Sequence, residues 1–420
     1  MRARIASFTG LAVGFAAAVA YTFSTTTLGD YGYQVAPAMN ALLDGDVSEF
    51  FRVQPVYGGF STLARLPFSA LARVADGDEQ LVFQFGVLPC LMVLALAGVG
   101  LVKVMRRTQQ SRLVEFVVGF LLLANPVTFA AIQRGHPEEL LAAALVLAAA
   151  LAAISRRPIW AAVLLGLALG TKQWALLAVI PVLIACGPGF RLRMALIAGA
   201  LAVALTVPMA VADSGQFVHN NEMAKGGWGH ASRFSVWWPI GSPQKAGSAG
   251  SSQVTVRKLA KRWTYFARPL IVVLALGLSL LFWLRRRGLV PADTLGLLAL
   301  LLLLRCLLDP MNNDYYHAPF LIFLVAWEGI RVRGLPVLSL FAAAALWATT
   351  RSDWLSPETL GAHFYLVNNV FYLACMVPLA CWLIWILFGC RAAESPSPTS
   401  GPGHTGMTRA WIREPQSSPL

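Results

Sequence analysis

The carboxylate of Asp30 is the first candidate for chemistry in this chain of 420 residues. It follows the first long apolar run, about residues 5–23, by only a few positions, so it should lie at the depth of lipid headgroups. An aspartate is ionised at neutral pH, and a well-placed, desolvated carboxylate can take a proton from a hydroxyl. Asp44 and Asp46 lie in the same loop and are rival bases, although Asp-Gly-Asp is also an ordinary turn sequence.

A second concentration of polar groups lies between two apolar runs, at residues 306–320, which read CLLDPMNNDYYHAPF. Such a density of carboxylate, amide, phenol and imidazole groups is unusual for so short a link, and it favours a site. The candidates there are Asp314, Tyr316 and His317. The alternative is that Asn-Asn-Asp merely forms a turn and that the tyrosines and the histidine belong to an interfacial belt.

Lys172 is a candidate because of the sequence around it. Residues 158–187 have basic residues on both sides, so both ends should face the cytoplasm, and about thirty residues are too many for one span. We expect two short helices joined by a tip, residues 170–175, that reads GTKQWA. Irregular backbone at that depth must be buried in protein or line a cavity. The alternative is a helix-end lysine that reaches up to the headgroups.

The turn before the apolar run 138–154 is also polar, since Arg134, His136, Glu138 and Glu139 lie at the mouth of that segment. Its sequence His-Pro-Glu-Glu is not the HExxH pattern of zinc proteases, and no spacing typical of metal ligands occurs in the chain. Walker and dinucleotide-binding fingerprints are absent from the sequence as well. This turn is therefore a candidate for binding or proton transfer rather than for a metal centre.

A large loop, residues 213–266, is rich in groups that could bind a sugar or fold over the membrane interface. These groups are His219, Asn220, Asn221, Glu222, Lys225, Trp228, His230, Trp237 and Trp238. Within the loop, residues 241–253 should be a flexible insertion. The basic stretch 257–263 is either a site for an anionic lipid headgroup or a solvated face.

These residues belong to a chain that is too apolar for water. It is 57% hydrophobic and 13% charged, with a mean hydropathy of +0.64, whereas soluble domains have about 45–50% apolar and about 25% charged residues. The six cysteines lie in or beside apolar runs without a CxxC pair, as small hydrophobic residues do. The composition predicts an integral membrane protein and excludes a soluble enzyme, a disulfide-rich secreted protein and a disordered chain.

We expect an all-α, polytopic membrane protein of about 12 transmembrane helices, with both termini cytoplasmic. The apolar segments cover about 5–23, 81–103, 113–131, 138–154, the two halves of 158–187, 194–212, 267–284, 289–308, 318–330, 334–350 and 364–389. Residues 1–390 should form one domain, and the Pro-, Ser- and Gly-rich tail 391–420 should be disordered. The first segment could alternatively be a cleaved signal peptide.

The charges agree with this topology. The inner side would hold 18 basic and five acidic residues, so it would carry the whole net charge of +13. Because positive charge collects on the cytoplasmic side of membrane proteins, the basic pI requires no nucleic-acid partner. The outer side would hold 15 of the 20 acidic residues and five of the six histidines. We therefore expect a site that opens to the extracytoplasmic side.

The first outer loop, residues 24–80, has motifs found in a known family. It reads D-x-x-x-Q, then a small-residue helix, L-x-G-D, Q-P-x-Y and an amphipathic stretch with L-P-F. Residues 134–184 add a polar residue that opens a helix, a short turn, G-x-x-L-G-x-K and a Pro-containing helix. Together these motifs resemble the polyprenol-phosphate-dependent mannosyltransferases of glycosyltransferase family 87, in the GT-C superfamily, over about residues 5–335.

The resemblance implies an inverting transfer of one sugar from a polyprenyl monophosphate to an acceptor hydroxyl. It places the catalytic base at Asp30 and a histidine near the base or the donor phosphate at His317. A phosphate leaving group needs no protonation, so one carboxylate suffices, but the developing negative charge needs fixed cations or donors. The expected contacts to donor phosphate or substrate are Lys172, Arg134, His136, Glu138, Asp314 and Tyr316.

The expected function is therefore a hexosyltransferase of the plasma membrane, with mannose as the sugar and an envelope glycolipid or glycan as the acceptor. Enzymes of the resembling kind need no metal, so none is expected, and the expected partners are the polyprenyl-phosphate donor, the acceptor and membrane lipids. Two alternatives stay open. A transporter or flippase would show paired broken helices in two similar halves, and a non-catalytic assembly protein would share the polar loops. Donor sugar, acceptor, linkage and oligomeric state are not determined by the sequence.

Overall fold

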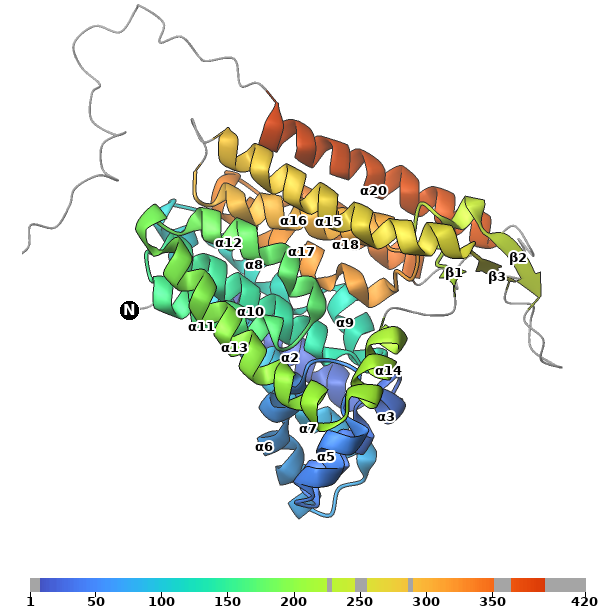
Figure 1. Cartoon of the computed structure of the whole chain (residues 1–420). Coiled ribbons are helices and arrows are strands. Elements are labelled where there is room, and N and C mark those ends of the chain that lie inside the picture. Colours follow the sequence, from blue (N-terminus) through green and yellow to red (C-terminus); the bar gives the residue numbers. More distant parts are fainter. Residues whose placement is uncertain (1–7, 225–228, 246–254, 286–289, 351–363, 390–420) are drawn as a thin grey trace, which may run out of the picture.

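The computed structural model describes residues 8–224, 229–245, 255–285, 290–350 and 364–389. Within these ranges the chain is a bundle of helices, with a small sheet and several short helices at one end (Figure 1). Six helical stretches are long and apolar enough to cross a membrane, and shorter apolar helices lie between them. The prediction of an all-α, polytopic membrane protein is confirmed.

Each predicted apolar segment coincides with one helix or with two consecutive ones. These helices are α2 (Thr9–Ser24), α7 (Glu79–Arg107), α8 (Arg112–Leu123) with α9 (Pro126–Gln133), α10 (Pro137–Ile154), α11 (Pro158–Leu169), α12 (Val179–Ala185), α13 (Arg191–Ala212), α15 (Lys261–Leu284), α16 (Asp293–Leu308), α17 (Ala318–Arg331), α18 (Val337–Thr350) and α20 (Phe364–Phe388). The predicted termini, the tail 391–420 and the loop candidates Lys225 and Trp228 lie outside the described residues.

Two breaks in the helices matter for the site. Between α8 and α9, Asn125 caps the new helix by accepting hydrogen bonds from the backbone N–H groups of Val127 and Thr128, at 3.0 and 2.9 Å, and Pro126 fits the first helical turn. After α11, the chain turns at residues 170–172 and continues as the 3₁₀ helix η2 (Gln173–Ala178) and α12. The second break has the predicted hairpin shape, with Lys172 at its tip.

The first long loop folds into four helices, in blue at the lower end of Figure 1: α3 (Tyr31–Gln34), α4 (Ala36–Leu43), α5 (Val47–Val53) and α6 (Gly59–Val74). Helix α6 is amphipathic, and its exposed apolar side chains include Leu71 and Val74. Its opposite face packs on α7. This arrangement is typical of helices that lie along a membrane interface.

The second large loop contains α14 (Ser214–Ala224) and an antiparallel sheet of β1 (His230–Ala231), β3 (Thr255–Lys258) and β2 (Ser242–Lys245), in that order. The short helices η3 (Pro188–Phe190), η4 (Trp238–Ile240) and η5 (Asp314–His317) complete the elements. Trp237 and Trp238 are buried in an apolar cluster of their own with Leu259 and Ala267. The expected insertion 241–253 therefore includes a strand, and residues 246–254 lie outside the described part of the chain.

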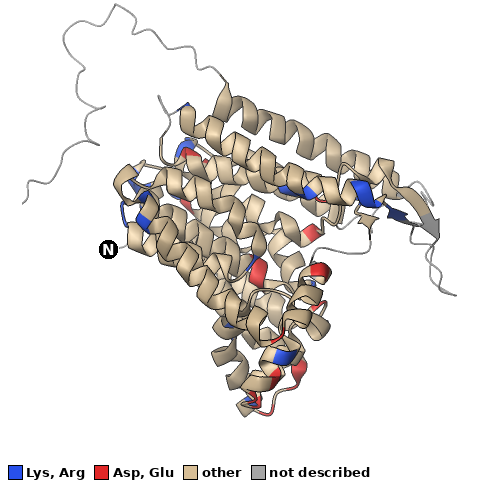
Figure 2. Cartoon of the chain, in the orientation of Figure 1, with Lys and Arg blue, Asp and Glu red and all other residues tan. Residues whose placement is uncertain are grey.

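Burial separates the helices into an inner and an outer set. Helices α10, α16 and α17 are buried on nearly all sides, whereas α13 and α15 expose much of their apolar surface. Figure 2 shows Lys and Arg at both ends of the bundle, including β3 and the start of α15, whereas most Asp and Glu lie toward the end that carries α3, α5 and α14. Near the acidic end, these helices bring together polar residues that lie far apart in the sequence.

Candidate active site

Two turns that lie far apart in the sequence are in direct backbone contact at the outer end of α2 and α10. The N–H of Asp30 donates to the carbonyl oxygen of Arg134 at 2.8 Å. Gly29 and Gly135 have φ of +54° and +81°, and a Cβ on Gly29 would come within 2.3 Å of the Arg134 carbonyl. Only glycine permits both this backbone conformation and this approach. The contact fixes Asp30 next to His136.

Asp30, His136 and Glu138 form a continuous chain of short contacts. His136 Nε2 is 2.9 Å from Asp30 Oδ2, and His136 Nδ1 is 2.8 Å from Glu138 Oε1. Although burial opposes its charge, the two carboxylates raise the pKa of His136. Burial also opposes ionisation of Asp30, but the hydrogen bond and the charge of His136 hold the pKa of Asp30 below its usual value. These contacts thus favour the ionised form of Asp30 and the protonated form of the buried His136.

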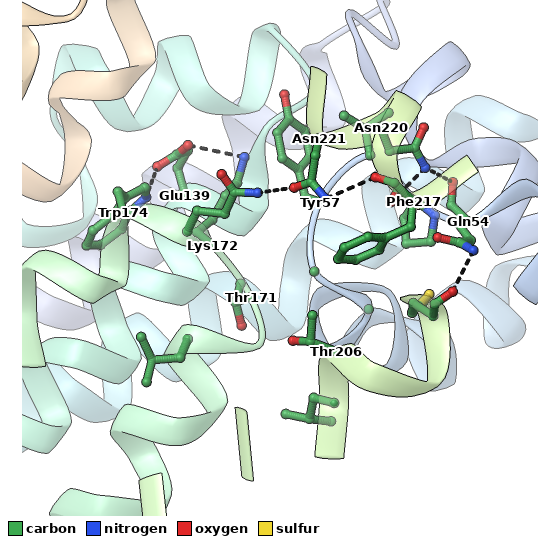
Figure 3. Close-up of a pocket in the computed structure, with 18 of the residues that line it drawn as sticks. Gln54, Tyr57, Glu139, Thr171, Lys172, Trp174, Thr206, Phe217, Asn220 and Asn221 are labelled. Carbon is green, nitrogen blue, oxygen red and sulfur yellow. Dashed lines mark hydrogen bonds and ion pairs between the residues drawn. The ribbon is translucent and has the colours of Figure 1, made fainter. Parts of the chain in front are cut away.

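Lys172 extends this chain into the protein. Its Nζ lies 3.0 Å from Glu138 Oε1, 3.2 Å from Glu139 Oε1 and 3.0 Å from the centre of the Tyr57 ring (Figure 3). Its side chain is only 5% exposed, so the ammonium does not reach outward as a helix-end lysine would. Trp174 Nε1 donates to the other oxygen of Glu139 at 2.6 Å. The hairpin tip is thereby attached to the start of α10.

A cavity of about 140 Å³ lies beside Lys172 (Figure 3). The loop Gln54–Gly59 forms one wall, and this loop is held by Asn220 of α14, whose Nδ2 donates to the carbonyl of Gln54 at 3.2 Å. Gln173 donates to Asn221 across the same space. Polar side chains around the cavity are Gln54, Tyr57, Glu139, Thr171, Lys172, Gln173, Thr206, Asn220, Asn221, Arg305 and Tyr316.

Arg305 is a functional candidate that the sequence reasoning missed. It lies near the end of α16, it is packed over the ring of Tyr316 at 4.6 Å, and its Nη1 is buried without a hydrogen-bond partner among the described residues. A single arginine in the run LLALLLLLRCLL was the signal, because ionisable groups inside membrane segments are rare and usually functional. An unpartnered buried guanidinium nitrogen is suited to an anionic ligand.

A second cavity, of about 250 Å³, lies on the other side of Arg305 and Tyr316. Its lining combines Arg305, Arg268 and Asp309 with apolar side chains of η2 and α15. Among the apolar side chains, Leu176 and Val272 are 66% and 50% exposed. The opening is therefore apolar and leads to the surface of α15, most of which is unburied. A lipid chain could lie in this opening while its charged end meets the arginines.

A row of rings connects the two ends of the site. His136 stacks on Tyr315 at 4.0 Å between ring centres, Tyr315 meets Tyr316 edge-on at 4.8 Å, and Tyr316 contacts Arg305. Burial raises the pKa of both tyrosines, so their hydroxyls stay protonated. The row has the carboxylate of Asp30 at one end and, at the other, Arg305, whose Nη1 has no hydrogen-bond partner among the described residues.

At the rim of the site, Arg134 Nε lies 3.5 Å from Asp314 Oδ2. The side chain of Arg134 is 62% exposed and that of Asp314 is 12% exposed. The structure thus brings six of the eight predicted site residues into one neighbourhood: Asp30, Arg134, His136, Glu138, Lys172 and Tyr316, with Asp314 attached through Arg134.

His317 lies apart from this neighbourhood. It is fully buried, with Nδ1 2.9 Å from the Asp314 carbonyl oxygen and Nε2 2.8 Å from the Tyr372 hydroxyl. Asn312 Nδ2 is 3.4 Å from the same Nε2. Burial lowers the pKa of His317 to about 4, so it is neutral at pH 7. These contacts tie the turn to α20, and a catalytic role for His317 stays a prediction.

A further charged group, Arg65 of α6, is wholly buried behind Asp30. Its Nε donates to the Gly86 carbonyl at 3.2 Å and its guanidinium lies 4.9 Å from the Tyr31 ring centre. Neither terminal nitrogen has a hydrogen-bond partner among the described residues, and the same holds for Glu138 Oε2. Arg65 thus adds a buried positive charge on the protein side of the site, close enough to interact electrostatically with Glu138. This role was not predictable from the sequence, because Arg65 has the spacing of a residue on the polar face of an amphipathic helix.

The rival carboxylates of the first loop have other contacts. Asp44 is 60% exposed and lies 3.2 Å from Arg73, a surface ion pair. Asp46 caps α5 by accepting from the N–H of Glu49 at 2.9 Å. In the part of the chain that the structure describes, no three His, Cys, Asp or Glu side chains are arranged to hold a metal ion.

Of the comparisons with known proteins, only the one with solved structures gives a match. No protein-family model matches the chain, and no curated protein sequence matches it. Among solved structures, it is similar to ArnT from Cupriavidus metallidurans bound to undecaprenyl phosphate, with 13% sequence identity and a TM-score of 0.44. The match covers 90% of this chain and 77% of that chain.

Proposed function

We propose that this protein is a membrane glycosyltransferase that moves a hexose, with mannose as the first candidate, from a polyprenyl monophosphate to a hydroxyl of an envelope glycolipid or glycan. The reaction takes place in the plasma membrane at a site open to the extracytoplasmic side, with inversion and without a metal ion. The sequence resemblance to GT-C mannosyltransferases supports this assignment. The observation that carries it is a partly exposed Asp30 held by the buried imidazole of His136, which lies between two carboxylates.

In the proposed step, Asp30 takes the proton of the acceptor hydroxyl while the hydroxyl oxygen forms a bond to the anomeric carbon. The bond between that carbon and the phosphate oxygen breaks, and its electron pair leaves with the polyprenyl phosphate. His136 is a positioning residue, since it holds Asp30 Oδ2 at 2.9 Å. A general base in this position contributes about 10²- to 10⁴-fold to the rate.

The donor phosphate is proposed to lie against Arg305. Lys172 is close to the same cavity, but its charge is already matched by Glu138 and Glu139 at 3.0 and 3.2 Å. Arg305 has an unpartnered nitrogen, and preorganised cations at a developing phosphate charge are effective in a water-poor site. The polyprenyl chain would leave through the apolar opening between η2 and α15.

The test uses membranes from cells that lack this protein and express the wild type, Asp30→Asn or Asp44→Asn. The membranes receive radiolabelled polyprenyl-phosphate mannose and native envelope lipids, and label is measured in new glycolipid. Asp44→Asn is the matched control, because it removes the same charge from the same loop at a surface ion pair. We expect activity in the wild type and in Asp44→Asn and its loss in Asp30→Asn, at equal protein level.

Two other outcomes are informative. If Asp30→Asn stays fully active, Asp30 is not the base. If no variant transfers mannose or any other lipid-linked sugar supplied in the same way, the transferase assignment is wrong and a transporter becomes the better reading.

A further inference from the structure

A long apolar groove lies away from the site cavities, on the side of the bundle formed by α7, α10 and α11. Helix α10 packs against both α7 and α11 and forms the floor between them. The groove has a volume of about 690 Å³, and its lining shares no residue with either cavity at Arg305. It is therefore a separate feature of the molecule.

The apolar part of the groove matches one leaflet of a membrane in length. Along α7 the lining runs from Val93 to Arg107, and its part from Val93 to the first cation, Lys103, is ten residues of α-helix that rise about 15 Å at about 1.5 Å per residue. The hydrocarbon core of a bilayer is about 30 Å thick, so this distance is about half of it. Between these positions the lining is aliphatic apart from small residues such as Ala97 and Gly100. An acyl chain of one leaflet fits this stretch better than a chain that crosses both.

One end of the groove is basic. Lys103, Arg107 and Arg157 line it there and are exposed, and none of the three has an ion-pair partner among the described residues. No Asp or Glu lines the groove. Trp160 lies at the same end, where an indole suits the level of lipid headgroups.

We propose that this groove binds an anionic phospholipid, with an acyl chain along α10 and the phosphate among Lys103, Arg107 and Arg157. Under the orientation proposed above, the lipid belongs to the cytoplasmic leaflet. The polyprenyl-phosphate donor is not the occupant, because its phosphate belongs at the other end. That end is lined by Phe60, Ala64 and other apolar side chains and carries no cation.

The experiment is native mass spectrometry of the full chain in detergent, titrated with phosphatidylglycerol or with phosphatidylcholine of the same acyl chains. We expect phosphatidylglycerol to bind at least tenfold more tightly. The triple variant Lys103→Gln, Arg107→Gln, Arg157→Gln should bind it about 100-fold more weakly, since each such cation near a membrane surface is worth about 1 kcal/mol. The matched control is Arg112→Gln, Arg193→Gln, Arg333→Gln, which removes equal charge from exposed residues outside the groove.

A second variant tests the groove without changing charge. A Cβ on Gly100 would meet only Leu151 Cδ1, at 3.5 Å, so Gly100→Leu fits the helix and fills the groove. It should weaken phosphatidylglycerol binding about tenfold. Equal binding of the two lipids, an equal loss in the control triple variant, or unchanged binding in Gly100→Leu would each overturn the proposal. So would displacement of phosphatidylglycerol by equimolar polyprenyl phosphate, which would make the groove a donor-chain site.

Discussion

Two polar regions with similar sequence signals have different physical characters. The Asp30 network, made of Asp30, His136, Glu138, Glu139 and Lys172, consists of alternating charges with contacts of 2.8 to 3.2 Å. The His317 turn, residues 312–317 with Tyr372, consists of neutral hydrogen bonds around a buried imidazole.

This difference indicates that the Asp30 network is the candidate active site and that the His317 turn has a structural role. The Asp30 network reaches solvent through Asp30, whose side chain is 37% exposed, and borders a cavity through Lys172. His317 has no exposure, and each of its nitrogens already faces a protein partner. A histidine in a polar motif therefore indicates a catalytic site only when its ring contacts a carboxylate and the pair lies next to solvent or a cavity.

The largest expected effect is on transfer. Asp30→Asn keeps the shape of the side chain but removes the base, so the transfer rate should fall about 10²- to 10⁴-fold. His317→Gln can still bond Tyr372 and should keep at least a third of the wild-type rate. Initial rates of glycolipid labelling at matched protein level measure both. A larger loss in His317→Gln than in Asp30→Asn would reverse the assignment of site and support.

The next effect is on stability. Glu138→Gln leaves the buried cations His136 and Lys172 short of one anion, and breaking a buried ion pair costs about 3–5 kcal/mol. Tyr372→Phe removes one neutral hydrogen bond from His317 and should cost about 1–3 kcal/mol. Denaturation in detergent, followed by tryptophan fluorescence, compares the two variants. Equal losses would mean that the charges of the Asp30 network are not what makes it different.

The two histidines should respond to pH in opposite directions. Burial lowers the pKa of His317 from 6.5 to about 4, so between these values only the unfolded chain binds the proton, and stability falls by about 3 kcal/mol as the pH drops from 6.5 to 4. At His136 the carboxylates outweigh burial and raise the pKa. The folded chain then keeps a proton that the unfolded chain loses above pH 6.5, and this contribution disappears as the pH rises through the folded pKa.

The measurement is the unfolding midpoint against pH for the wild type, His317→Gln and His136→Gln. His317→Gln should flatten the acid side of the curve, and His136→Gln should flatten the side above pH 6.5. If either variant changes the opposite side, the environment assigned to that histidine is wrong.

The smallest effect is expected where the two regions meet. Arg134 and Asp314 are 3.5 Å apart and Arg134 is 62% exposed, so Arg134→Gln should change stability by less than about 1 kcal/mol. Its effect should shrink further in high salt. A loss above 2 kcal/mol would show that the regions depend on each other for stability.

The fold was predictable because its signals are local. Each apolar segment is a contiguous run, and basic flanks mark the turns on one side, so the hairpin at Lys172 followed from its two basic ends. The strands of the 230–258 loop were not predictable, because they are short and pair across a sequence gap.

The individual residues of the candidate site were predictable from the sequence, but the contacts between them were not. Asp30, His136, Glu138 and Lys172 each stood out locally, yet nothing in the sequence indicated that one imidazole joins two of the carboxylates. Arg305 was missed although a lone arginine in a leucine run is a recognisable signal. Tyr57 was missed because its role depends on Lys172, 115 positions later.

The glycine contact between the turns at Gly29 and Gly135 also affects when the site can exist during synthesis. Asp30 and His136 are 106 positions apart, and a ribosome adds about 5–20 residues per second. Asp30 therefore waits about 5–20 s for its partner, while two further apolar segments are made. A nascent chain that stops before residue 136 carries the carboxylate without its support, so the reactive centre is assembled only once the first third of the protein has been made.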